Sequence, residues 1–371
     1  MRRAWTIIFS FILGGLAHGQ DPIEYEVAAE LPMEFPPGNI TVTPYGRIIV
    51  SMHQFYEPKL RLAELVIEDE GTTVSVKPFP NAEANDAGTT DGLKLDTVLG
   101  LQCDARGVVW LLDNGMRGGS VPKLISWVAE KDQVGRVIYI PPPATVEGSF
   151  LNDLAIDIKR AMCYIADPVA GGKDALIVVS LRTGLSRRVL QGHSSVVPED
   201  VDIVIEERPL EISRPDGTTV RPRIGVNPIV LDAQSEWVYY GPMTGGALYR
   251  IPADALADPA LDDAALARQI ERYSDKPHCD GISIDSADNI YISEIEANAV
   301  GVIAPDRSYR RLFQDELLSW PDAFSFGPRH YMYVVAAQLH RSKLLAGGVD
   351  RSEMPFRILR FRSLAPGIIG R

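Results

Sequence analysis

Hydrophobic and polar positions alternate along most of this chain, in short runs separated by turn residues. Six times the alternation takes the same form: an apolar strand, a turn and a second apolar strand. The six phrases are TVTPYGRIIV from Thr41, LQCDARGVVW from Leu101, LAIDIKRAMCY from Leu154, IVLDAQSEWVY from Ile229, ISIDSADNIY from Ile282 and FSFGPRHYMY from Phe324. Alternation with a period of two is typical of half-buried antiparallel strands, so each phrase predicts a β-hairpin.

The spacing of the six hairpins predicts the fold. A propeller blade of four antiparallel strands needs roughly 40–50 residues, and the segments between the phrases read as further strand–turn–strand units. The pattern therefore predicts an all-β protein, a six-bladed β-propeller, with a β-sandwich or two smaller β domains as the alternatives. A propeller ring must be sealed, and the strand-like segments Glu24–Leu31 and Pro355–Phe361 are expected to share the sealing blade.

Two longer insertions interrupt the repeat. Residues 197–224 are acidic at first and contain a Pro-Asp-Gly turn, which predicts a protruding hairpin. Residues 252–273 are rich in Ala, Leu and acids at helical spacing, which predicts one or two short helices.

Each phrase also carries an aspartate or another turn residue at its fourth position, and five of the six carry an aromatic residue on the second strand. The aspartates are expected to cap the hairpin turns, and the aromatic residues to pack between blades. The aspartates are Asp104, Asp157, Asp232 and Asp285, and the aromatic residues are Trp110, Tyr164, Tyr239, Tyr291 and Tyr333.

The first 19 residues have the pattern of a secretory signal. Arg2 and Arg3 precede an apolar run, and Ala17-His18-Gly19 is a small-x-small cleavage site. The run is shorter than the roughly 20 apolar residues that span a bilayer, although an uncleaved anchor is the alternative. The predicted organisation is a signal peptide over residues 1–19 and the propeller over residues 20–371, in a secreted or periplasmic protein.

Charge and cysteine content narrow the possible partners. The formal net charge is −12, and no basic patch interrupts the acidic surface, so we expect no binding to nucleic acid and none to membranes after signal cleavage. The three cysteines, Cys103, Cys163 and Cys279, are an odd number in a long chain. They are better explained as small buried thiols than as a disulfide framework.

A polar residue lies five positions before the fourth residue of five of the six phrases. The set is Asn39, Leu99, Asn152, Asn227, Asp280 and Asp322. Because the innermost strands of a propeller line the central channel, these side chains should meet at one channel mouth. Asp153 and His278 lie close enough in sequence to join them. Amide and carboxylate oxygens suit a hard cation such as Ca²⁺ or another divalent ion, but they equally suit a polar ligand or a repeated turn.

Several longer motifs resemble the major royal jelly protein and Yellow family across most of the chain after residue 19. They are LQCDARGVVWLLDNG from Leu101, SFLNDLAID from Ser149, YIADPVAGGKDALIVVSLRTGLSRRVL from Tyr164, LYRIPADAL from Leu248 and SDKPHCDGISIDSADNIYISEIEANAV from Ser274. The resemblance implies a secreted six-bladed propeller that binds small molecules at the channel mouth. Some Yellow-like members are linked to dopachrome conversion. The last phrase departs from the family, since AAQLH at 336–340 replaces a Ser-Asn-Arg-like step.

The motifs are also similar, more distantly, to gluconolactonase and senescence marker propellers. Those hold a divalent metal through a Glu, Asn residues and an Asp that also serves as base. The similarity implies metal ligands at Asn152, Asn227 and Asp280, with Asp280 as the catalytic base. The Glu is missing, and Asn39 is the nearest polar residue at its position, which weakens the expected metal affinity.

Three functions follow from these patterns. The first is a Yellow-like protein that binds a small polar or aromatic molecule and isomerises it in the manner of a dopachrome tautomerase, with Asn39, Asp153, His278 and Asp322 as ligand-binding residues. The second is a metal-dependent sugar-lactone hydrolase, in which Asp280 activates water. The third is a binding protein without catalysis. The sequence leaves open which of the three applies.

Overall fold

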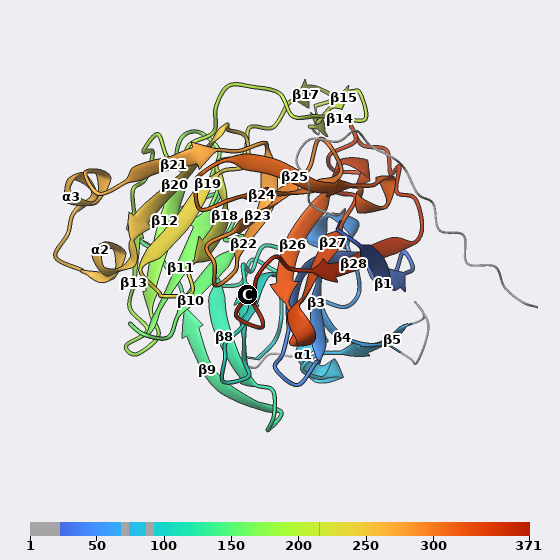
Figure 1. The fold of residues 1–371 in the computed structure, drawn as a ribbon, viewed down its shortest axis with the longest axis horizontal. Helices are drawn as coiled ribbons and strands as arrows, with labels where there is room; N and C mark the ends of the chain where they lie inside the picture. Colours follow the sequence, from blue (N-terminus) through green and yellow to red (C-terminus); the bar gives the residue numbers. More distant parts are fainter. Residues whose placement is uncertain (1–22, 68–73, 87–92, 215) are drawn as a thin grey trace, which may run out of the picture.

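The structure is a computed structural model that describes residues 23–67, 74–86, 93–214 and 216–371. These residues form six four-stranded antiparallel sheets arranged in a ring (Figure 1), which confirms the predicted six-bladed β-propeller. The predicted signal peptide lies outside the described residues. Within them, no helix is long and apolar enough to cross a membrane.

The blades follow the chain in order. Blade 1 contains β2 (Pro37–Val42), β3 (Ile48–Met52), β4 (Leu62–Ile67) and β5 (Val74–Pro78). Blade 2 contains β6 (Val98–Cys103), β7 (Val108–Asp113), β8 (Lys123–Val128) and β9 (Gln133–Tyr139). Blade 3 contains β10 (Leu154–Asp157), β11 (Met162–Asp167), β12 (Ala175–Ser180) and β13 (Ser186–Val189). Blade 4 contains β18 (Val226–Leu231), β19 (Trp237–Pro242), β20 (Ala247–Pro252) and β21 (Glu271–Asp275). Blade 5 contains β22 (Cys279–Ile284), β23 (Ile290–Glu294), β24 (Ala299–Ile303) and β25 (Tyr309–Gln314).

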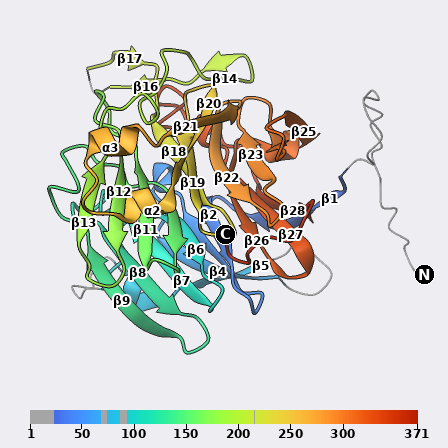
Figure 2. The same cartoon turned by 60° about the vertical axis from the view of Figure 1, so that its left-hand side comes forward.

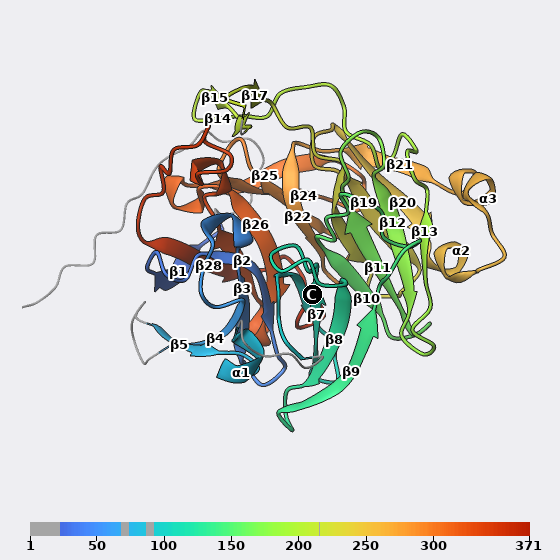
Figure 3. The ribbon, with the colours of Figure 1, turned by 180° about the vertical axis from the view of Figure 1, so that it is seen from behind.

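Blade 6 seals the ring from both ends of the propeller. It contains β26 (Pro321–Phe326), β27 (Tyr331–Ala336), β28 (Phe356–Arg362) and, as its outermost strand, β1 (Tyr25–Leu31). β1 pairs antiparallel with β28, from Tyr25 opposite Phe361 to Leu31 opposite Phe356 (Figure 3). The two leftover segments of the sequence therefore share the sealing blade, as predicted.

The six repeated phrases form the two inner strands of each blade. The innermost strands β2, β6, β10, β18, β22 and β26 contact one another in sequence around the channel. The turn aspartates cap the hairpins as predicted, and three of the four also accept a hydrogen bond from the aromatic residue of the next strand. Trp110 Nε1 donates to Asp104 at 3.2 Å, and Tyr291 Oη donates to Asp285 at 3.0 Å. The three cysteines are buried and unpaired.

Residues 197–224, which we call the flap, project from one end of the ring (Figure 2). They form two small hairpins where the sequence predicted one. Their strands are β14 (Val204–Ile205), β15 (Arg208–Pro209), β16 (Ile212–Ser213) and β17 (Thr219–Val220). The buried side chains Ile203 and Ile205 belong to the same apolar cluster as Leu339 and Leu345 of the loop after β27, so the flap is packed onto blade 6.

The described helices are all short. The insertion between β20 and β21 forms α2 (Ala253–Ala257) and α3 (Asp263–Ala267) at the periphery of blade 4 (Figure 1), as predicted. The others are α1 (Ala82–Asn85) and the 3₁₀ turns η1 (Gln54–Tyr56), η2 (Glu316–Leu318), η3 (Pro328–His330) and η4 (Leu339–Arg341).

Residues 363–371, which we call the tail, run back from β28 into the central channel (Figure 1). The backbone of Gly370 accepts from Cys103 N at 3.1 Å and from the Thr41 hydroxyl at 2.8 Å. Arg371 donates from Nη1 to the carbonyls of Leu231 and Asp232 at 3.0 and 2.9 Å. These partners lie at the turn ends of the inner strands, so the tail fills the end of the channel opposite the flap.

Candidate functional site

All six residues of the predicted ring line one pocket at the flap end of the channel. The backbone explains why they converge. In five of the six inner strands the pairing with the next strand shifts register at this position, and in blade 3 the strand begins only at Leu154, after Asn152. A β-bulge re-aims the side chain it carries, so a backbone irregularity repeated in the blades turns these side chains into the channel.

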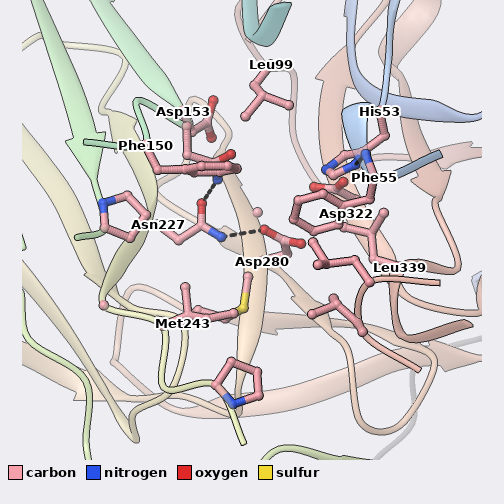
Figure 4. A pocket seen from close by; sticks show the side chains of 18 of the residues that line it. His53, Phe55, Leu99, Phe150, Asp153, Asn227, Met243, Asp280, Asp322 and Leu339 are labelled. Atoms are coloured by element: carbon pink, nitrogen blue, oxygen red, sulfur yellow. Dashed lines mark hydrogen bonds between the residues drawn. The ribbon is translucent and has the colours of Figure 1, made fainter. Parts of the chain in front are cut away.

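The pocket has a cavity volume of about 250 Å³ and a polar floor beneath largely apolar walls. The floor carries Asn39, Asn152, Asp153, Asn227, Asp280 and Asp322. The walls include Phe55, Leu99, Phe150, Met243 and Leu339 (Figure 4). Trp320 also lines the pocket, and the flap adds Ile212, Pro222 and Ile224. A pocket of this kind, apolar with a few convergent polar groups, is the usual form of a small-molecule site.

The side chains of blades 3 to 6 form a continuous chain of hydrogen bonds across the floor. Asn152 Nδ2 donates to Asn227 Oδ1, and Asn227 Nδ2 donates to Asp280 Oδ1 at 2.6 Å (Figure 4). Trp320 Nε1 donates to the other carboxylate oxygen of Asp280 at 2.7 Å. Both oxygens of Asp280 therefore have a donor within the protein.

Trp320 is a site residue that the sequence did not predict. Its backbone φ is +53°, a left-handed conformation that is an outlier for a bulky residue. The side chain is 1% exposed and stacks on His340, with ring centroids 6.0 Å apart. Backbone strain of this kind persists where the surroundings enforce it and clusters at functional sites; here it brings the indole N–H to Asp280.

Asp153 and Asn39 form a second polar pair on the floor. Asn39 Nδ2 donates to Asp153 Oδ1 at 3.3 Å, and the backbone N–H of Leu154 donates to the same oxygen at 2.9 Å. The amide oxygen of Asn39 accepts from Ile40 N at 2.8 Å. These two side chains therefore help to order the backbone as well as line the pocket.

Burial changes the acid–base properties of the floor. It raises the pKa of Asp153 to about 7. It also raises the pKa of Asp280, although the hydrogen bonds from Trp320 and Asn227 oppose this by favouring the carboxylate. The pKa of Asp322 is raised well above its ordinary value by burial and then by the charges of Asp280 and Asp153. Carboxyl groups that exchange protons near neutral pH suit general acid–base chemistry.

His53 is a second site residue that the sequence left unassigned. It lines the pocket, and its ring packs edge-on against Phe55 with centroids 4.5 Å apart. Its Nδ1 accepts from Phe55 N at 3.3 Å, which caps the η1 turn. Burial, and after it the nearby charge of Arg117, lower its pKa to about 3, so the imidazole is neutral.

The prediction for His278 is corrected. This residue lies two positions before Asp280, but it does not line the pocket. Its Nδ1 instead lies 3.1 Å from Glu296 Oε2. The reason is the end of the strand: His278 precedes β22 and faces the adjacent loop, whereas the bulge between Cys279 and Ile282 turns Asp280 inward.

The sequence of the chain matches the family model of the major royal jelly proteins over residues 97–365. The chain belongs to the major royal jelly protein family. The match covers blades 2 to 5 and most of blade 6, so four of the polar positions at the recurring register, from Asn152 to Asp322, fall inside it. No curated protein sequence matches the chain.

Solved structures of other proteins resemble this member of the family in fold alone. A luciferin-regenerating enzyme is 11% identical, with a TM-score of 0.55 over 92% of this chain and 97% of that one. A putative gluconolactonase is 13% identical, with a TM-score of 0.53 over 94% and 95%. The virginiamycin B lyase of Staphylococcus aureus is 12% identical, with a TM-score of 0.50 over 92% and 100%.

The floor of this royal jelly family protein fits a preformed calcium site poorly. Calcium takes 6–8 oxygen ligands. Of the oxygens on Asn152, Asn227 and Asp280, three already accept hydrogen bonds from neighbouring side chains. Among the described residues, no group of three His, Cys, Asp or Glu side chains is arranged to hold a metal. A bound cation would have to replace the hydrogen bonds that organise the floor.

Proposed function

We propose that this protein binds a small, partly aromatic molecule in the channel-mouth pocket. The observation that carries the proposal is the pocket itself, in which aromatic and aliphatic walls stand over a floor of amides and carboxyl groups. The walls would cover the ring of the ligand, and the floor would fix its polar end. The cavity of about 250 Å³ suits a compound of one or two rings.

The floor further supports a proton shift on the bound molecule, of the kind that a tautomerisation requires. Such a reaction needs one group that accepts a proton and another that donates one. Asp280 is held by two donors as a carboxylate, which suits a base. Asp153, whose pKa is raised to about 7, exchanges its proton near neutral pH. The reaction would be an isomerisation and would need no oxidant.

The test is a thermal-shift and turnover screen of the purified protein. The probes are L-dopachrome, L-3,4-dihydroxyphenylalanine and glucono-δ-lactone, each with added CaCl₂ and with EDTA. We expect the aromatic probes to raise the melting temperature by mass action, and we expect calcium and EDTA to change nothing. If L-dopachrome binds without conversion, the protein is a binding protein only.

The second candidate is the metal-dependent lactone hydrolase. It is favoured by the placement of Asn152, Asn227 and Asp280 side by side on one floor, with Asp280 5% exposed. Hydrolysis of glucono-δ-lactone that is lost in EDTA and restored by a divalent ion would place this candidate first. It would also show that the cation displaces the hydrogen bonds between these side chains.

We also propose that the protein is exported, on the pattern of its first 19 residues. N-terminal sequencing of material from the culture medium or periplasm should begin at or near Gln20. Recovery of an intact Met1 in the membrane fraction would contradict export with cleavage.

A further inference from the structure

The polar groups of the pocket divide into two sets by their hydrogen bonds. On one side, Asn152, Asn227 and Asp280 are connected to one another and to Trp320. On the other side, no described residue forms a hydrogen bond with the carboxyl group of Asp322 or with Nε2 of His53. Figure 4 shows His53, Phe55 and Asp322 together on the side of the pocket facing Asn227. Both groups line the pocket, so both are available to form hydrogen bonds with a ligand.

The chemistry of His53 is fixed by its backbone contact. Nδ1 accepts the N–H of Phe55, so the proton of the neutral ring is on Nε2. His53 is 6% exposed and its Nε2 is not fully enclosed by protein. It is therefore a hydrogen-bond donor that lines the pocket, held in one tautomer by a main-chain group.

Asp322 supplies the complementary group. It lies at the bulge of β26, between Pro321 and Phe324, and the bulge turns its side chain into the pocket. The carboxyl group accepts hydrogen bonds from a ligand. The two unpaired groups thus come from blades 1 and 6, which are neighbours in the ring because β2 packs on β26.

We infer that His53 and Asp322 form a subsite that recognises a hydroxyl group on the ring of the ligand. The hydroxyl oxygen accepts the Nε2–H of His53, and the hydroxyl proton is donated to Asp322. The inference rests on the proposed function and deepens it, because it names the group by which the aromatic ligand is selected.

A hydroxyl group fits this pair better than the other common polar groups. An ammonium group can donate to Asp322 but cannot accept from His53. A methoxy group can accept from His53 but cannot donate to Asp322. In either case the ligand removes water from one group of the pair without giving it a hydrogen-bond partner, which costs binding free energy. Phe55 and Leu339 stand beside the pair, so the carbon skeleton of the ligand would continue from the hydroxyl along an apolar wall.

Other charged groups in the pocket do not compete for the ligand hydroxyl. Asp153 and Asp280 have donors of their own. At the mouth, Asp174 accepts from Val169 N, and Arg223 pairs through Nε and Nη2 with Asp200 and Asp202 of the flap. Nη1 of Arg223 has no partner among the described residues, but it is a donor only and cannot accept the hydroxyl proton. Behind His53, Arg117 donates to the carbonyl of Pro58.

The test compares two fluorescent probes that differ by one methyl group, 2-naphthol and 2-methoxynaphthalene. We expect the wild-type protein to bind 2-naphthol at least roughly tenfold more tightly. The variants His53→Phe and Asp322→Leu should lose this preference while they still bind both probes weakly. His53→Gln, which keeps an N–H donor, should restore part of it. The matched control is His278→Phe, which alters a histidine outside the pocket and should leave the preference intact.

The outcomes distinguish a failure of the proposed subsite from a failure of the proposed function. If wild-type protein binds both probes equally, the subsite is wrong but an aromatic pocket remains. If it binds neither probe, the proposed function fails and the subsite fails with it. The wild-type comparison decides the matter even if a variant does not fold. A preference that survives in both variants would also overturn the assignment.

Discussion

The turn aspartates show how one buried carboxylate can organise a blade. Asp157 is fully buried and accepts from Arg160 N at 3.0 Å, from Arg160 Nη1 at 2.8 Å and from Tyr164 Oη at 3.2 Å. Asp285 likewise accepts a hydrogen bond from Tyr291 Oη, and it also accepts one from the backbone N–H of Ala365 in the tail at 3.1 Å. The same residue therefore closes the turn, positions the aromatic side chain and, in blade 5, anchors the tail.

This arrangement predicts unequal effects within one cluster. Asp157→Ala leaves several buried donors without a partner and should destabilise the protein by about 3–5 kcal/mol. Tyr164→Phe removes only one hydrogen bond and should cost about 1 kcal/mol. Urea unfolding followed by tryptophan fluorescence measures both. Equal costs would mean that the hydrogen bond from Tyr164 accounts for the whole stabilising effect of the Asp157 carboxylate.

Asp153 predicts a dependence of stability on pH. Its pKa is raised to about 7 in the folded protein, whereas it is about 3.9 when unfolded. The folded state therefore holds the proton more tightly, and stability falls as the pH rises from about 4 to about 7. Asp153→Asn mimics the protonated group, so it should raise the melting temperature by about 2–4 °C at pH 8 and change little at pH 4. An increase of the same size at both pH values would contradict this.

The sequence predicted part of this site because part of it repeats. Asn39, Asn152, Asn227, Asp280 and Asp322 occupy one register, and the register coincides with a bulge in five blades. Trp320 and His53 lie outside the repeated phrases, and their roles depend on a left-handed backbone at one and a 3₁₀ turn at the other. Neither conformation leaves a periodic signal, so only the structure could find them.

At the scale of elements, polar and apolar contacts attach the flap to the loop after β27 in blade 6. Arg341 Nη2 donates to Glu206 Oε1 at 2.5 Å, and Glu211 N donates to Leu345 O at 3.2 Å. Ile205 adds a buried side chain beneath the flap. The sequence predicted a projection here, but a composition of acids and turn residues could not show that it folds back over the pocket as two hairpins.

A substitution that creates a cavity beneath the flap should loosen the flap without unfolding the blades. Ile205→Ala removes packing between the flap and the loop after β27. Amide exchange should therefore accelerate across residues 197–224, while the melting temperature changes by less than about 2 °C. The control is Ile292→Ala, at the centre of β23, where a cavity of the same kind should cost about 2–5 kcal/mol globally. Hydrogen-exchange mass spectrometry distinguishes the two. Uniform exchange in the Ile205 variant would show that the flap is part of the cooperative unit.

At the scale of the whole molecule, two segments hold the ring closed. β1 completes blade 6 by pairing with β28, and the tail bonds to blades 1, 2, 4, 5 and 6 from inside the channel. The sealing blade was predictable because strands need partners. The tail was not, because its PGIIGR segment has no strand or helix pattern and is held by backbone groups.

Two glycines give a matched test of the tail. Gly370 has a φ of +91°, and a Cβ there would lie 2.4 Å from the carbonyl oxygen of Cys103; Gly46 has a φ of +83° with open space around it. Gly46→Ala should cost about 1 kcal/mol for its backbone conformation alone. Gly370→Ala should cost clearly more, by about 1–3 kcal/mol, because it also displaces the tail. Thermal unfolding measures both, and equal costs would show that the tail contributes little to stability.

The tail also decides how molecules reach the floor of the pocket. With the far end of the channel filled by Gly370 and Arg371, the mouth beneath the flap is the one route that the described residues leave for a ligand in either direction. A loosened flap lowers the same barrier for arrival and departure. Association and dissociation should then both quicken, and the residence time of the ligand should shorten. Because Ile212, Pro222 and Ile224 of the flap also line the pocket, dissociation should quicken more than association.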